Sequence, residues 1–97
     1  MFKETAEDIA VKDRLWSATE AEAMRFAKRC ADAHVVGSAY SEGQKDVTHI
    51  AFKKGYPKGL IRKLATHIRA NREEDRTALL LEYRSSIGLN VGVASHA

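Results

Sequence analysis

Five apolar residues between Pro57 and Asn71 recur at helical spacing, and this stripe constrains the fold more than any other feature of the chain. Residues three and four apart in sequence are neighbours on a helix surface, so the five side chains share one face. Pro57 suits the first turn of such a helix, because the amide that proline lacks would have no partner there. The sequence therefore predicts a helix over residues 57–70 that buries Leu60, Ile61, Leu64, Ala65 and Ile68.

An earlier helix is marked by a capping pattern at its start. Ser17 can accept a hydrogen bond from the amide of Glu20, and the Glu20 carboxylate can reach back to the amide of Ser17. Trp16 stands just before this cap, where it can pack against the first turn. The sequence therefore predicts a helix over residues 17–34, and its buried face carries Ala23, Phe26, Ala27, Cys30 and Ala33.

The stretch between these two helices alternates in the manner of a β-hairpin. Residues 35–40 begin with two valines, and residues 47–54 are rich in side chains that suit a pleated surface. A polar turn with one glycine separates the two segments. The pattern predicts a hairpin over about 35–54, with Ile50 and Phe52 on the face that packs against the helices.

The segment that follows Asn71 fits either a helix or a strand. Asn71 can cap a helix, and acidic residues follow it, which predicts a helix over residues 72–86. Residues 77–84 also alternate as in a strand, and three consecutive leucines require burial on more than one side in either form. Residues 1–8 are expected to fray, and the alternating apolar residues within 87–97 could add an edge strand or dock on a partner.

Together these elements predict a single α+β domain over residues 1–97. In one arrangement, two or three helices cover one face of a small antiparallel sheet formed by the hairpin. In the other, an early strand within residues 9–16 and a late strand over residues 77–84 extend the sheet in the order β-α-β-β-α-β. A chain of this length has a thin core, so we expect a homo-oligomer in which copies share apolar surface. The expected core is Phe26, Ala27, Cys30, Ile50, Phe52, Leu60, Ile61, Leu64, Ile68, Leu80 and Leu81.

Composition limits the cellular setting. The single cysteine, Cys30, excludes an intramolecular disulfide, which is typical of a reducing cytoplasm. No apolar run approaches the length of a membrane span, and the first ten residues lack the apolar segment of a signal peptide. We therefore expect a cytoplasmic protein with no membrane partner.

Positive charge is concentrated in one part of the chain, although the net charge is only +3. Seven of the sixteen Lys and Arg residues lie between Lys53 and Arg72, and no acidic residue follows them until Glu73. Concentrated charge favours a polyanionic partner or an acidic protein surface. The candidate contact residues are Lys53, Lys54, Lys58, Arg62, Lys63 and Arg69.

Two functions follow from this basic segment. The first is a small nucleic-acid-associated regulatory protein that contacts the phosphate backbone without reading bases. The alternative is a non-catalytic inhibitor or adaptor that docks its basic face on an acidic partner, as small phage and plasmid proteins do against host defence complexes. A solvated polar helix face explains the same residues without any partner. Tyr56, beside the basic segment, fits either a packing role or stacking on a base.

Catalytic, metal and cofactor motifs are missing from the sequence. The four histidines are not paired at the spacing of a zinc site, and none is near Cys30 in sequence. Cys30 falls on the alanine-rich face of its helix, which indicates a core thiol rather than a nucleophile. The glycines lack the spacing of a phosphate-binding loop. We therefore expect no enzyme activity, no metal and no cofactor.

Overall fold

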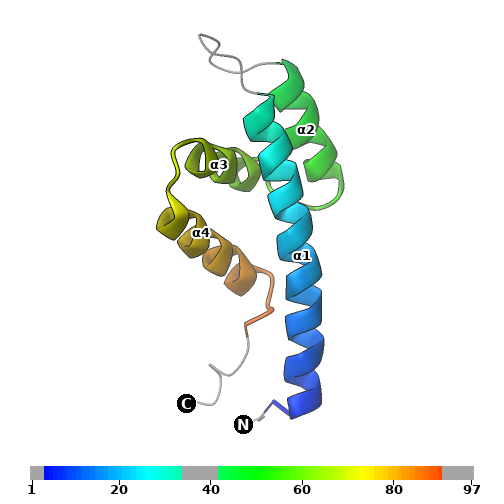
Figure 1. Cartoon of the computed structure of the whole chain (residues 1–97). Helices are drawn as coiled ribbons and strands as arrows, with labels where there is room; N and C mark the ends of the chain where they lie inside the picture. The colour runs from blue at the N-terminus through cyan, green and yellow to red at the C-terminus, as the bar shows by residue number, and fades with distance from the viewer. Residues whose placement is uncertain (1–3, 34–41, 91–97) are drawn as a thin grey trace.

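The chain forms a bundle of helices. The computed structural model describes residues 4–33 and 42–90, and within these ranges it contains four helices and no strand (Figure 1). The predicted α+β fold with its antiparallel sheet is therefore wrong. The helices are α1 (Ala6–Asp32), α2 (Glu42–Lys53), α3 (Lys58–Arg69) and α4 (Glu73–Ser86).

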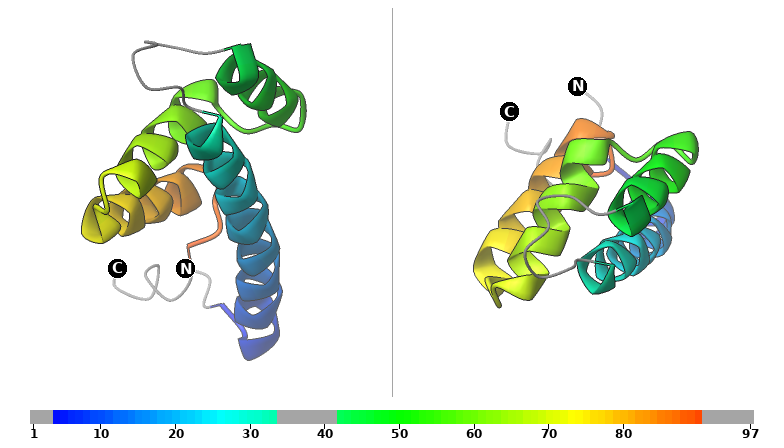
Figure 2. Two further views of the ribbon diagram at one scale, coloured as in Figure 1. Left: turned by 45° about the horizontal axis from the view of Figure 1, so that its top comes forward. Right: turned by 90° about the horizontal axis from the view of Figure 1, so that it is seen from above.

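The longest helix, α1, contacts each of the other three helices. Figures 1 and 2 show α2 and α3 packed beside the C-terminal half of α1, with α4 stacked on α3. The end of α4 returns to the first half of α1, where Arg84 donates to the Asp13 carboxylate at 2.8 Å. Beside this ion pair, the rings of Trp16 and Tyr83 lie 6.3 Å apart. Among residues 4–33 and 42–90, the first part of α1 is thus contacted by the end of α4 and by the segment that follows it.

The first helix starts eleven residues earlier than predicted. Thr5, not Ser17, is the N-cap: its hydroxyl accepts from the amide of Asp8 at 3.0 Å, and the Asp8 carboxylate accepts from the amide of Thr5 at 3.3 Å. Residues 6–8, which were expected to fray, form the first turn of α1. The pattern at Ser17 lies inside the helix, because the burial of Trp16 against α4 favours an unbroken helix there.

Helix α2 stands where the second strand of the hairpin was predicted. Its buried residues follow the spacing of a helix face, at Gln44, Val47, Thr48 and Ala51. Two of these are polar and hydrogen-bonded: the Gln44 amide donates to the Cys30 carbonyl of α1 at 3.4 Å, and the Thr48 hydroxyl donates to the Lys45 carbonyl at 3.0 Å. The predicted first strand, residues 35–40, lies outside the described residues.

The helix over 57–70 is confirmed, and both its ends show why it forms. Pro57 is the N-cap of α3, one position before the first turn in which it was predicted. Asn71 ends the helix in a left-handed conformation with φ 55°, so it is a C-terminal stop and not the predicted N-cap of the next helix. The amides of Asn71 and Arg72 donate to the carbonyls of Ile68 and His67, which is the Schellman arrangement.

Residues 73–86 form a helix, so the alternative of a strand over 77–84 is wrong. Gly88, at φ 78°, stops α4 in the same way that Gly55, at φ 102°, stops α2. Three acidic residues occupy the first turn of α4, as expected from the helix dipole. The tail from residue 91 onward is outside the described part of the chain.

Most of the predicted core is buried, and the errors lie on α2 and α4. Ile50, Phe52 and Leu81 are 42%, 56% and 55% exposed, because α2 and α4 each bury one narrow face as helices. Ile68 is half-buried. Trp16 and Tyr56 are buried although the sequence did not place them in the core. The predicted residues that the structure buries are Phe26, Ala27, Cys30, Leu60, Ile61, Leu64 and Leu80.

Candidate functional site

A groove between α2 and α3 gathers several of the basic residues. We call it the α2–α3 groove. Lys58 and Arg62 are four residues apart on α3 and therefore project from the same side of that helix. The wall from α2 adds Lys45 and His49, which sequence reasoning did not include in the site. The groove is lined by Lys45, Asp46, Thr48, His49, Lys58 and Arg62.

Arg69 extends this basic side along α3. At about 100° per residue, Lys58, Arg62 and Arg69 fall within about 40° of one another around the helix axis. All three are exposed. Arg69 lies eleven residues after Lys58, which is about 16 Å along the helix. This length fits contacts to successive phosphates better than contact to a single small anion.

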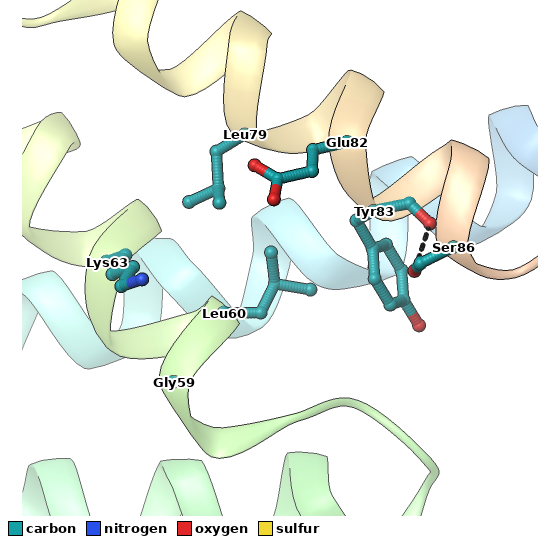
Figure 3. Close-up of a pocket in the computed structure, with 7 residues that line it drawn as sticks. All are labelled: Gly59, Leu60, Lys63, Leu79, Glu82, Tyr83 and Ser86. Carbon is teal, nitrogen blue, oxygen red and sulfur yellow. Dashed lines mark hydrogen bonds between the residues drawn. The ribbon is translucent and has the colours of Figure 1, made fainter.

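Lys63 is separated from these residues. It projects from another side of α3 into a hollow between α3 and α4, where Figure 3 shows it beside Leu60 and facing Leu79 and Glu82 of α4. The backbone carbonyl of Tyr83 at the far side of this hollow accepts a hydrogen bond from the Ser86 hydroxyl at 2.7 Å. Of the six predicted contact residues, Lys63 therefore lies outside the α2–α3 groove.

Lys54 turns toward α1, on the opposite flank of α2. Its ammonium lies 3.5 Å from the Glu22 carboxylate and 5.8 Å from the centre of the Phe26 ring. Lys53, one residue earlier, is exposed in the last turn of α2. A second hollow, which we call the α1–α2 hollow, therefore has cations from α1 and from the residue after α2, and its lining is Glu22, Arg25, Phe26, Arg29, Ile50 and Lys54.

Charge is unevenly distributed along the chain. Residues 42–72 contain eight Lys and Arg residues and two acidic residues. The first turn of α4 then carries three consecutive acids, starting at Glu73. Opposite charges on different parts of a small molecule give it a directed field, with α2 and α3 on the positive side.

Tyr56 is a packing residue. It is 6% exposed, its hydroxyl donates to Glu22 at 2.8 Å, and its ring lies 5.8 Å from that of Phe26. The pKa of the Glu22 carboxyl is lowered, mainly because the Tyr56 hydroxyl donates a hydrogen bond to it. Burial has a smaller effect and raises this pKa, whereas the charge of Lys54 lowers it further. Burial and the Glu22 charge raise the pKa of the Tyr56 hydroxyl. Stacking of Tyr56 on a base is therefore excluded in this fold.

The Tyr56–Glu22 contact predicts a dependence of stability on pH. A carboxyl whose pKa is lower in the folded chain stabilises the fold above its unfolded pKa of about 4.3, and the stabilisation is lost as the pH falls through the folded pKa. Tyr56→Phe removes the main cause of that lowering. We expect the parent to be more stable than Tyr56→Phe at pH 7, and the gap to narrow at pH 3. Denaturant titrations at both pH values measure this, and an equal gap at both would contradict the assignment.

Cys30 is a core thiol, as predicted. It is 1% exposed, and burial raises its pKa although Arg69 and Arg62 oppose this. Residues 4–33 and 42–90 contain no group of three side chains able to hold a metal ion. Two of the histidines, His34 and His96, are outside these ranges. None of the described helices combines the length and the apolar composition that crossing a membrane requires.

Comparison of the chain with protein-family models, curated proteins and solved structures found no match. The interpretation of the α2–α3 groove therefore depends on its own residues.

Proposed function

We propose that this protein binds nucleic acid through the phosphate backbone, with the α2–α3 groove as the main contact surface. The observation that carries the proposal is the meeting of cations from two helices in one groove, with Lys45 from α2 and Lys58 and Arg62 from α3. Lys and Arg side chains that contact phosphates release condensed counterions, which supplies most of the affinity of non-specific binding. Asp46 is the one acid that lines this groove.

The groove suits binding without base reading. Phosphate contacts fix the position of a protein on nucleic acid but carry no sequence information. We therefore infer a small cytoplasmic regulatory protein that binds mixed sequences with similar affinity and acts without a chemical step. Arg25 and Arg29, in the α1–α2 hollow, extend the positive surface across α2.

Binding to fluorescently labelled oligonucleotides of mixed sequence tests the proposal. We expect the anisotropy of the label to rise with protein concentration at low salt, with little difference between sequences. A parent protein that binds neither single strands nor duplexes at low salt would overturn the proposed function.

A protein-binding inhibitor or adaptor is the second candidate, because Phe52 is exposed beside the cations of the α2–α3 groove. Protein interfaces often combine a central aromatic residue with a polar rim, and Arg is enriched in them. Such a protein would dock this surface on an acidic partner and would not need to bind nucleic acid. Salt-dependent binding to mixed nucleic acids separates the two candidates, since only the regulator must show it.

We also propose that a second copy of the chain covers the first part of α1. This helix has 27 residues, about 40 Å, whereas α2 has 12 residues, about 18 Å, and lies along only part of it. Val11 and Leu15, four residues apart on one side of α1, remain 40% and 53% exposed. Light scattering is expected to give the mass of a dimer, and Leu15→Glu the mass of one chain. One chain mass for the parent at all concentrations would contradict this.

A further inference from the structure

Phe52 is the largest exposed apolar side chain in the described ranges, and it lies among cations. It is 56% exposed. Lys45, His49 and Phe52 are spaced by four and three residues, so they project from the same side of α2, the side that lines the α2–α3 groove. The ammonium of Lys58, from the opposite wall, lies 5.1 Å from the centre of the Phe52 ring. An aromatic ring and a lysine of the α2–α3 groove thus occupy adjacent positions.

The position of Phe52 is unlike that of the other exposed apolar residues. Leu81 on α4 lies beside Glu73 and Glu74, in surroundings that repel phosphate. Val11 and Leu15 lie on the first part of α1, away from α2 and α3. Phe52 alone among them combines an aromatic face with a neighbouring cation of the groove. An exposed aromatic ring in a basic groove is the arrangement by which proteins hold unpaired bases.

We propose that Phe52 stacks on an unpaired base of a single strand whose backbone lies in the α2–α3 groove. The proposal rests on the proposed function and names the class of nucleic acid that the groove prefers. In a duplex the faces of the bases are covered by their neighbours, so a ring at the groove has no base face to contact. In a single strand a base can leave its neighbours and lie on the ring while Lys58 contacts a nearby phosphate.

The test compares Phe52→Leu with Phe52→Trp and with the parent, on one single-stranded sequence and on its duplex. Leucine keeps an apolar side chain and a good helix former but has no aromatic face. We expect Phe52→Leu to weaken binding to the single strand by about 5- to 150-fold and to leave duplex binding unchanged. Phe52→Trp is expected to keep or strengthen single-strand binding. Leu81→Ala, which alters an exposed leucine outside the groove, is expected to leave both affinities unchanged.

The outcomes separate this inference from the proposed function. If the parent binds the single strand and the duplex equally, and Phe52→Leu changes neither, stacking is overturned while backbone binding stands. Equal weakening of both ligands by Phe52→Leu also overturns stacking, because it shows a contact that does not depend on base exposure. If the parent binds neither ligand, both proposals fall. Circular dichroism of each variant establishes that the helices are retained.

Discussion

Truncation of Leu64 to alanine is expected to lower the free energy of unfolding by about 2–5 kcal/mol. Leu64 is fully buried, and it belongs to the core cluster that joins α3 to α1 and α4 through Trp16 and Leu80. Removing its three terminal carbons leaves a cavity that three surrounding helices can fill only in part. Denaturant titration followed by circular dichroism measures the loss.

The matched control is the same substitution at an exposed position. Leu81 lies on α4 and is 55% exposed, so Leu81→Ala removes the same atoms without creating a cavity. We expect the free energy of unfolding to change by less than about 0.5 kcal/mol. A loss below about 1 kcal/mol for Leu64→Ala, or equal losses for the two variants, would show that the centre of the core is misplaced.

Charge reversal at Lys58 and Arg62 is expected to abolish nucleic-acid binding. Both side chains line the α2–α3 groove, so Lys58→Glu with Arg62→Glu replaces two attractive contacts with two that repel phosphate. Both residues are exposed, so the helices should be retained. We expect at least about a 100-fold weakening at low salt, on the order of the contribution of two or three phosphate contacts. Fluorescence anisotropy measures the affinity.

A second double variant controls for the change in net charge. Arg14 and Lys28 are exposed on α1 and lie on its outer side, away from the α2–α3 groove. Reversing both to glutamate alters the net charge by the same amount. We expect this variant to keep most of the affinity of the parent. If both double variants weaken binding equally, the effect comes from net charge and the groove is not the site.

The sequence predicted α3 well because its local signals agree with one another. The apolar stripe, Pro57 before the helix and the polar residues after it all favour the same element. The amphipathic pattern of α3 is strong enough that packing against α1 did not need to alter it. The helical option for residues 72–86 was also correct, because α4 has an acidic first turn and Gly88 as its stop.

The predicted hairpin failed because the buried face of α2 is half polar. Gln44 and Thr48 occupy two of its four buried positions, so the apolar residues alone did not show a helical period. Alternation of Thr48, Ile50 and Phe52 then gave a false strand pattern. The residues of α2 that are buried, from Gln44 to Ala51, do recur at the three- and four-residue spacing of a helix. This spacing can be recognised in the sequence only if hydrogen-bonded polar residues are counted as possible core residues. Only the packing of α2 against α1 distinguishes the helix from the strand for these residues.

Part of the candidate site could be predicted from the sequence, because α3 was predicted correctly. Lys58, Arg62 and Arg69 share a side of α3, which follows from the helical spacing. Lys45 and His49 were missed because a hairpin would have placed them in a turn and on a strand. Lys63 was included because its border position on the stripe does not show that α4 lies beside it. Tertiary packing determines on which surface Lys45, His49 and Lys63 lie, and the sequence pattern does not contain that information.

The dependence of binding on salt tests the central claim most directly. If Lys45, Lys58, Arg62 and Arg69 each contact a phosphate, the logarithm of the association constant for a single strand should fall with the logarithm of salt concentration with a slope of about −3. The Lys58→Glu and Arg62→Glu double variant removes two contacts and should show a shallower slope wherever its binding is measurable. A slope near zero for the parent, or equal slopes for parent and variant, would contradict nucleic-acid binding through the α2–α3 groove.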